Sequence, residues 1–217
     1  MQRDTSRDHA RIHVLAGVNG AGKSSVGGAT IRAFGADYYN PDEVARALIA
    51  ASPMLDRRQA NALAWQQGRR MLERAIVERL DFAFETTLGG VTLTRLLSGA
   101  ADAGIDVHAW YVGLADVRLH IARVHARVAK GGHAIADDVI ERRFEHSRLN
   151  LIHLLPALAS LRVFDNSLDA DPAEGRAPQP SLVLQMTRRR IVAPDDLSRT
   201  PAWAKPIVAA ALAADQA

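Results

Sequence analysis

The feature that most constrains the fold is a glycine-rich loop between an apolar stretch and a run of residues able to form a helix. Residues 17–24 read Gly-Val-Asn-Gly-Ala-Gly-Lys-Ser and match the pattern G-x-x-x-x-G-K-[ST] at every fixed position. The apolar stretch Ile12–Ala16 precedes the loop, and residues 22–34 are a predicted helix. Because this motif needs a strand before it and a helix after it, the sequence predicts a phosphate-binding P-loop.

The residues of this loop have separate chemical uses. Glycines allow successive backbone N–H groups to point at phosphate oxygens, and the helix N-terminus adds the positive end of its dipole. We expect Lys23 to reach the β- and γ-phosphates of ATP and the Ser24 hydroxyl to ligate Mg²⁺. The predicted nucleotide-binding residues are Gly17, Asn19, Gly20, Ala21, Gly22, Lys23, Ser24 and Ser25.

Length and composition favour one globular domain over a membrane protein or a nucleic-acid-binding protein. The 217 residues, 48% of them hydrophobic, suffice for one α/β domain with additions, or at most for two small domains. We see no apolar run of membrane-spanning length and no secretory signal in residues 1–11, so we expect a cytoplasmic protein. The absence of cysteine excludes disulfides and thiolate metal sites. A net charge of +3 with 5% aromatic residues makes nucleic acid an unexpected partner.

Short apolar strands alternate with longer helices along most of the chain. Strands are expected at 12–16, 37–39, 82–84, 107–112, 161–164 and 182–186. Helices are expected at 22–34, from Asn40 onward, and at 57–80, 91–103, 116–129, 137–160 and 206–214, with a loop at 169–180. This alternation predicts an α/β fold, with an open, mainly parallel sheet and helices on both faces.

Polar residues follow the predicted strands at the sheet edge where ligands bind in such folds. Asn40 and Asp42 follow the second strand, and Glu85 and Thr87 follow the third. Transfer of a phosphoryl group to a hydroxyl needs a carboxylate base and a Mg²⁺ site, and either Asp42 or Glu85 could serve in these roles. The alternatives are a helix-capping function for Asp42 and a solvated charge at Glu85.

An arginine-rich helix followed by two glycines is a candidate lid. Arg123 and Arg127 are four residues apart and share one helical face, and Gly131-Gly132-His133 follows. Such a helix could close over phosphates and exclude water, although a solvated amphipathic face has the same pattern. Arg142 and Arg143 could supply another cation, with at least one of them paired to a neighbouring glutamate.

Together these motifs resemble the zeta-toxin family of P-loop kinases, in particular its short stand-alone branch. The matching segments, in family order, are residues 16–25, 40–46, 82–88, 111–114, 127–133, 140–144 and 164–167. The P-loop alone is shared with many ATPases. The segments Phe-Glu-Thr-Thr and Arg-Val-x-x-Gly-Gly-His are more specific.

The resemblance implies a P-loop NTPase fold and an ATP- and Mg²⁺-dependent kinase that phosphorylates a sugar hydroxyl of UDP-N-acetylglucosamine. In that family pattern Asp42 would be the catalytic base, and Arg127 or Arg123 would stabilise the γ-phosphoryl group beside Lys23. Asn40, Asp42, Glu85 and Thr87 would form the acceptor site. Residues 1–11 would be a flexible N-terminus, 12–167 the kinase domain with its lid at about 116–148, and 168–217 an extension packed on the same domain.

Two other functions are compatible with the same motifs. The acceptor could be a different hydroxyl compound, such as an antibiotic or a sugar acid. Alternatively the chain could be a nucleotide-dependent ATPase or nucleic-acid-binding switch, for which a basic stripe would be needed. No antitoxin segment is recognisable in the sequence, so a neutralising partner would be a separate protein.

Overall fold

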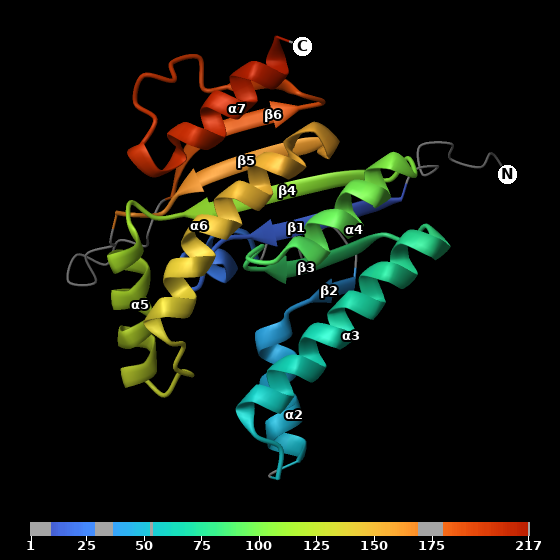
Figure 1. Cartoon of the computed structure of the whole chain (residues 1–217), viewed down its shortest axis with the longest axis vertical. Helices are drawn as coiled ribbons and strands as arrows, with labels where there is room; N and C mark the ends of the chain where they lie inside the picture. Colours follow the sequence, from blue (N-terminus) through green and yellow to red (C-terminus); the bar gives the residue numbers. More distant parts are fainter. Residues whose placement is uncertain (1–9, 29–36, 53, 169–179, 217) are drawn as a thin grey trace, which may run out of the picture.

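A seven-stranded sheet forms the middle of the molecule (Figure 1). The structure, a computed structural model, describes residues 10–28, 37–52, 54–168 and 180–216. The strands lie in the order β2-β3-β1-β4-β5-β6-β7. Their bounds are β1 Arg11–Ala16, β2 Asp37–Tyr39, β3 Phe82–Thr86, β4 Asp106–Gly113, β5 Ser160–Asp165, β6 Ser181–Thr187 and β7 Arg190–Ala193.

The first five strands in sequence are parallel, whereas the last two are antiparallel. The predicted mainly parallel sheet is therefore confirmed, as is the strand expected at 182–186. β7 was not predicted. It forms a hairpin with β6 through Arg188 and Arg189, whose φ angles of 45° and 71° suit a two-residue turn. These arginines, with Arg190, are exposed, as expected of that run.

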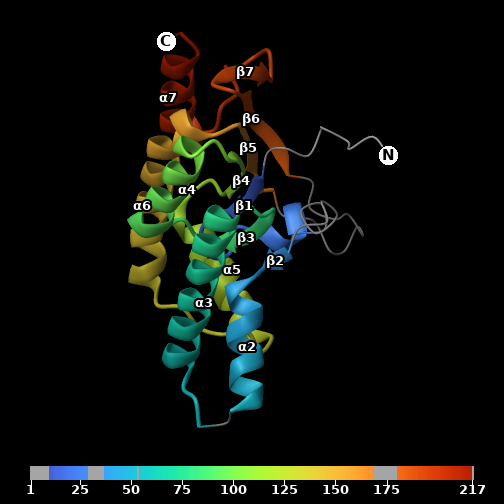
Figure 2. The ribbon, with the colours of Figure 1, turned by 90° about the vertical axis from the view of Figure 1, so that its right-hand side faces the viewer.

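Helices cover both faces of the sheet (Figure 2). They are η2 Ser24–Gly28, α2 Pro41–Ala51, α3 Arg57–Glu78, α4 Val91–Asp102, α5 Val117–Ala129, α6 Asp137–Leu154, η3 Leu155–Ala157, η5 Ala202–Ala204 and α7 Lys205–Asp215. Alternate strand residues point to opposite faces, and two apolar cores result. Val14 and Ala109 belong to the larger core under α4, α6 and α7, whereas Leu15 and Val112 pack near Val26 of η2.

α2 and the first half of α3 form a helical hairpin that extends beyond the β2 edge of the sheet (Figures 1 and 2). Asn40 is the N-cap of α2 and Pro41 its first residue, as predicted. Asp56 caps α3 in a reciprocal capping box with Gln59. The apolar residues Leu63 of α3 and Leu80, which follows this helix, are 45% and 44% exposed and are not part of the buried face.

Some predictions fall partly outside the described residues. These concern the flexible N-terminus at 1–11, the last part of the helix at 22–34 and the loop at 169–180. Within the described residues, no helix has the length and apolarity needed to cross a membrane.

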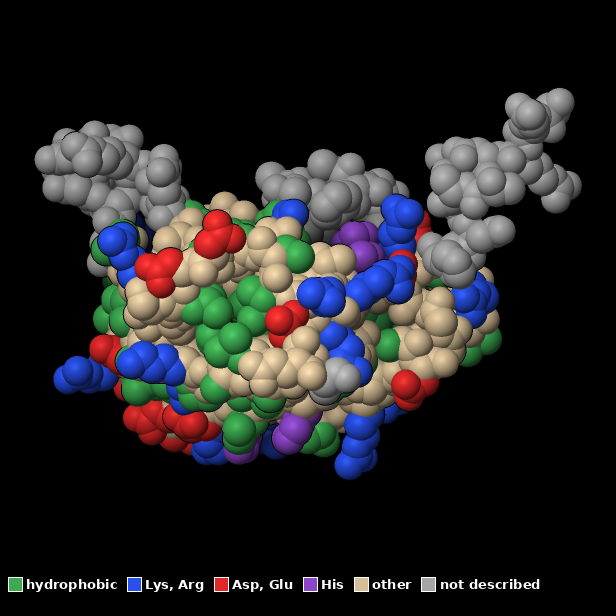
Figure 3. All heavy atoms as spheres, turned by 90° about the horizontal axis from the view of Figure 1, so that it is seen from above, with side chains coloured by type: hydrophobic (Ala, Val, Ile, Leu, Met, Phe, Trp, Pro, Cys, Tyr) green, Lys and Arg blue, Asp and Glu red, His purple; other side chains and the backbone are tan. Residues whose placement is uncertain are grey.

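The end of the molecule that carries α7 has a mixed surface (Figure 3). Hydrophobic side chains gather near its middle, and side chains of both charges surround them.

A single glycine in α3 allows this helix to pack against β2. A Cβ at Gly68 would lie 2.6 Å from the Tyr39 ring, which is buried and held by a hydrogen bond from its hydroxyl to the Ala64 carbonyl. We expect Gly68→Ala to lower the free energy of unfolding by about 1–3 kcal/mol in chemical denaturation.

Gly99 in α4 is the matched control, because a Cβ there would meet no atom within 4 Å. Gly99→Ala should stabilise the protein by up to about 1 kcal/mol through its helix propensity. Equal stabilisation by both substitutions would contradict the close packing of Tyr39 on α3.

Candidate functional site

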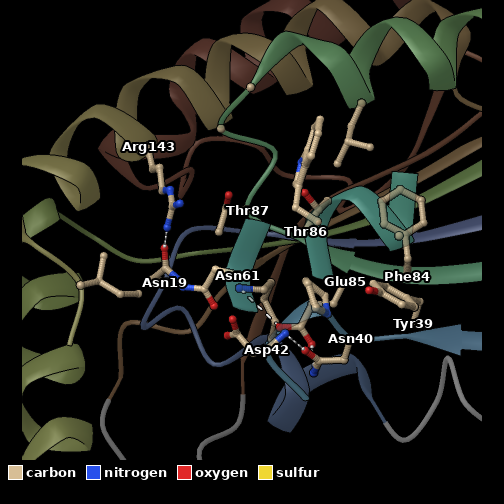
Figure 4. A pocket seen from close by; sticks show the side chains of 18 of the residues that line it. Asn19, Tyr39, Asn40, Asp42, Asn61, Phe84, Glu85, Thr86, Thr87 and Arg143 are labelled. Carbon is tan, nitrogen blue, oxygen red and sulfur yellow. Dashed lines mark hydrogen bonds and ion pairs between the residues drawn. The ribbon is translucent and has the colours of Figure 1, made fainter. Parts of the chain in front are cut away.

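A cavity of about 540 Å³ opens at the carboxyl ends of the parallel strands (Figure 4). The predicted site residues that line it are Asn19, Lys23, Asn40, Asp42, Glu85 and Thr87. They come from the P-loop and from the segments that follow β2 and β3. The structure therefore brings together residues that are up to 68 positions apart, between Asn19 and Thr87, as the parallel topology predicted.

The P-loop has the backbone conformation that its glycines permit. Gly17, Gly20 and Gly22 have φ angles of 143°, 83° and 83°. A Cβ would lie 2.3 Å from the Val112 carbonyl oxygen at Gly17 and 2.7 Å from the His120 carbonyl oxygen at Gly20. Glycine is thus required at these positions both by conformation and by space.

The Glu85 carboxylate is the centre of the hydrogen-bond network beside the P-loop. It lies 3.5 Å from the Lys23 ammonium, and both side chains are 9% exposed. Its other oxygen accepts hydrogen bonds from the Ser24 hydroxyl at 3.1 Å, the Tyr38 hydroxyl at 2.8 Å and the Asn40 amide at 3.3 Å. Glu85 therefore links Lys23 and Ser24 to the end of β2.

Asn19 connects the P-loop to two helices. Its carbonyl oxygen accepts a hydrogen bond from His120 Nδ1 of α5 at 2.8 Å, which places the proton on Nδ1. Its side-chain oxygen accepts a hydrogen bond from Arg143 of α6 at 2.7 Å (Figure 4). Burial lowers the pKa of Arg143, while Asp42 raises it. The guanidinium therefore stands at the cavity beside the predicted phosphate site.

Asp42 lies in the first turn of α2. The Asn40 side-chain oxygen accepts hydrogen bonds from the backbone N–H groups of Asp42 and Glu43 at 2.9 and 3.3 Å. The capping function that the sequence left open for Asp42 is therefore performed by Asn40. This leaves the Asp42 carboxylate in the cavity, at the positive end of the helix dipole.

Of the predicted lid, the structure places His133 in the cavity, whereas Arg123 and Arg127 are not among the described residues that line it. Arg127 donates a long hydrogen bond of 3.5 Å to the His133 carbonyl. Burial lowers the pKa of His133, and Asp42 opposes this shift. Contact of either arginine with the γ-phosphoryl group remains a prediction.

Arg143 and Arg142 were not distinguished in the sequence analysis, but the structure separates them. Arg142 pairs with Asp138 at 2.6 Å on the exposed side of α6, and Arg143, one residue later, points into the cavity. Consecutive helical residues are about 100° apart, so only one of the two can face the site. The spacing of the apolar residues along α6 is the sequence signal that could have distinguished Arg143 from Arg142.

Three cavity side chains on α3 were missed, and so was Tyr38 of β2, which contacts Glu85 but is not among the described residues that line the cavity. Asn61, Trp65 and Arg69 line the cavity at spacings of four. Their polar or aromatic character and equal spacing were visible in the sequence. However, that pattern is also typical of an exposed helix face.

The donor set at the P-loop suits a hard cation. Ser24 Oγ and a Glu85 oxygen are 3.1 Å apart, and Mg²⁺ prefers oxygen ligands. Among the described residues, no group of three or more His, Asp or Glu side chains could hold a metal ion. Mg²⁺ in nucleotide sites needs few protein ligands, because phosphate oxygens and water complete its coordination, so the residues present fit this ion.

Comparison with known proteins identifies one similar sequence. A protein of Haemophilus influenzae, described as uncharacterized, is 32% identical over 132 residues, which are 59% of this chain and 88% of that protein. No protein-family model matches the chain.

Several solved structures are similar in fold. The AvrRxo1-ORF1:AvrRxo1-ORF2 complex with sulphate ions has a TM-score of 0.66 at 14% identity, over 88% of this chain and 62% of that one. The same complex with ATP has a TM-score of 0.61 at 13% identity, over 85% and 60%. This chain thus spans about three fifths of that protein.

A structure of the PezAT chromosomal toxin–antitoxin system of Streptococcus pneumoniae has a TM-score of 0.55 at 13% identity, over 81% of this chain and 76% of that one. At such identities the similarity concerns the fold. The P-loop NTPase fold expected from the sequence is confirmed.

Burial of His120 makes the attachment of α5 to the P-loop sensitive to pH. The side chain is 1% exposed, and burial lowers its pKa to about 4. The unfolded chain, with a His pKa of about 6.5, therefore binds more protons between these values. Stability from this group is complete above pH 6.5 and is lost as the pH falls towards 4, by up to about 3 kcal/mol.

The measurement is the free energy of unfolding against pH for the wild type and for His120→Asn, whose amide can still donate to Asn19. The pKa of His13 is also lowered to about 4, mainly by burial, so the difference between the two proteins isolates His120. Parallel pH profiles for the wild type and the variant would contradict this account.

Proposed function

The chain belongs to the same family as the uncharacterized Haemophilus influenzae protein, and we propose that it is an ATP-dependent kinase that phosphorylates a hydroxyl group. The observation that supports this most directly is that Lys23 of the P-loop and the Asp42 carboxylate line one cavity. A hydrolase needs room for water only. A cavity of about 540 Å³ has room for a small-molecule acceptor next to the phosphate site.

Comparison with similar folds agrees with this proposal. The AvrRxo1-ORF1:-ORF2 complex has been solved with ATP, and the motifs of this chain resemble zeta-toxin kinases. The PezAT structure belongs to a toxin–antitoxin system. By the same resemblance, a neutralising antitoxin for this chain would be a separate protein, and the site of action would be the cytoplasm.

In the proposed reaction, the P-loop N–H groups bind the nucleotide phosphates, and Lys23 exchanges its contact with Glu85 for the β- and γ-phosphates. Asp42 accepts the proton of the acceptor hydroxyl as its oxygen forms a bond to the γ-phosphorus. The bond between that phosphorus and the β–γ bridging oxygen breaks, and ADP leaves with the electron pair. The products are ADP and a phosphate monoester.

Charge that develops on the transferred group is balanced by cations already at the cavity. Arg143 is held at the P-loop by Asn19, so it is oriented before the substrate arrives. Ser24 and Glu85 would hold Mg²⁺, which neutralises phosphate charge when bound. Residues 116–148, with Arg123 and Arg127, would act as a lid that excludes water.

For the acceptor we propose a sugar hydroxyl of UDP-N-acetylglucosamine, with Asn40, Glu85 and Thr87 near the sugar. This choice comes from the zeta-toxin resemblance, and another hydroxyl compound, such as an antibiotic or a sugar acid, is the alternative. The test is ADP release from ATP and Mg²⁺ with a panel of these acceptors. ADP release that no acceptor accelerates would indicate an ATPase and contradict the proposal.

Removing the proposed base should abolish transfer while leaving nucleotide binding intact. Asp42→Asn removes the proton acceptor but retains the shape of the first turn of α2. We expect kcat to fall by about 10²–10⁴, the usual contribution of a general base. Equilibrium binding of ATP should change by less than about threefold, a difference below 0.7 kcal/mol. A variant with normal kcat would exclude Asp42 as the base.

Neighbouring arginines provide a matched pair for the phosphate-stabilising role. Arg143→Ala removes the cation that Asn19 holds at the cavity and should lower kcat by about 10²–10³. Arg142→Ala removes an exposed ion pair with Asp138 and should leave kcat unchanged, because surface pairs contribute little. Equal rates for the two variants would show that Arg143 does not act on the transferred group.

A further inference from the structure

One face of α3 forms the wall of the cavity beyond the P-loop. Asn61, Trp65 and Arg69 follow each other at intervals of four residues, so they stack along one side of the helix. The opposite side of α3 packs on the core through Leu72 and Ala75. This wall is distinct from the residues that the proposed phosphoryl transfer uses.

The position of the wall is fixed by close packing on β2. The Tyr39 ring lies against Gly68, where a Cβ would be 2.6 Å away, and the Tyr39 hydroxyl donates to the Ala64 carbonyl at 2.5 Å. Ala64 and Gly68 flank Trp65 and Arg69 in sequence. The two cavity side chains therefore project from a backbone that is anchored to the sheet.

Trp65 and Arg69 together form an aromatic and cationic contact surface. Trp65 is 44% exposed although it lines a cavity, so part of its ring has no protein contact. The Arg69 guanidinium carbon lies 5.6 Å from the centre of that ring. A ligand in the cavity can thus touch the ring and the cation at once.

Arg69 is held only weakly by the protein. Its ion pair with Glu73, 3.4 Å long, joins side chains that are 40% and 42% exposed, and such pairs contribute little. The atom that faces Glu73 is Nε, which is buried and makes no hydrogen bond within the described part of the chain. The guanidinium can therefore turn to an anionic ligand at low cost, and an arginine–phosphate contact is stronger than the pair it replaces.

The charges around the cavity favour an anionic acceptor. Among its described lining residues the acids are Asp42 and Glu85, both at the P-loop end. At the P-loop end of the cavity, Lys23 and Arg143 would bind phosphates of ATP. Arg69 is the remaining arginine of the lining, so it is the cation available to an anionic group at the acceptor end of the cavity.

We propose that Trp65 and Arg69 select the acceptor, and that it is a sugar or nucleoside bearing a phosphate group. Its ring contacts Trp65, and its phosphate contacts Arg69, which orients the hydroxyl towards Asp42. This inference rests on the proposed kinase function, because it assigns the far end of the same cavity to the acceptor.

The test is a tryptophan fluorescence titration with three probes, in the presence of saturating ADP so that the nucleotide site is filled. The probes are UDP-N-acetylglucosamine, N-acetylglucosamine 1-phosphate and N-acetylglucosamine. We expect the two phosphorylated probes to bind at least tenfold more tightly than the neutral sugar. Arg69→Gln should remove most of this preference, because it keeps the stem of the side chain but loses the charge.

Arg70→Gln is the matched control, since Arg70 lies on the neighbouring face of α3 in a separate groove with Leu48 and Arg74. It should change the affinities by less than twofold. Trp65→Phe should abolish the fluorescence change while calorimetry still detects binding. Far-UV circular dichroism checks that each variant is folded.

The proposal is overturned if the neutral sugar binds as tightly as its phosphate, if Arg69→Gln and Arg70→Gln have equal effects, or if no probe binds the wild type. Failure of the kinase proposal would look different. In that case ADP would not bind, or no phosphoryl transfer would occur, while binding of the sugar phosphate would still depend on Arg69.

Discussion

The contact on which the site depends is the buried carboxylate of Glu85 next to the ammonium of Lys23. Both side chains are 9% exposed, and three further donors surround the same carboxylate, from Ser24, Tyr38 and Asn40. Removing one partner of a buried ion pair leaves the other charge unpaired, at a typical cost of 3–5 kcal/mol. The ends of β2 and β3 are thus tied to the P-loop before any ligand binds, and Asp42 is positioned through Asn40 by the same network.

This network also explains how phosphate can enter the site. The Glu85 carboxylate is the anionic partner of Lys23 and Ser24 in this structure. A phosphate oxygen has the same kind of charge and could make the same contacts. In the proposed function, ATP with Mg²⁺ would offer Lys23 a new anionic partner and Ser24 a new contact, so the lysine charge would stay compensated. The P-loop itself hardly needs to move, because Gly17 and Gly20 are packed against the backbone at Val112 and His120. Preorganised groups of this kind are effective in stabilising developing charge.

Much of this architecture follows from local sequence signals. The strand–loop–helix setting of Gly17–Ser24, the cap at Asn40 and the gathering of Asp42 and Glu85 at the strand ends depend on short-range patterns and on parallel topology. The orientation of Arg143 does not follow from such local signals, because it depends on which side of α6 meets the P-loop. Similarly, α3 periodicity could not show that Leu63 is exposed or that Trp65 faces a cavity, since both depend on where β2 meets the helix. The hairpin of β6 and the short β7 was not predicted. Its turn has positive φ angles at Arg188 and Arg189, and arginine is an unusual residue in such a turn.

The central claim is that one cavity brings the γ-phosphate of ATP to an acceptor hydroxyl. The most direct test is the mass of UDP-N-acetylglucosamine after incubation with the protein, ATP and Mg²⁺, with Lys23→Ala as the inactive control. The account predicts a product heavier by one phosphoryl group, formed in equal amount to ADP by the wild type and absent with the variant. ADP that accumulates together with free phosphate, while the mass of every acceptor offered stays unchanged, would contradict it.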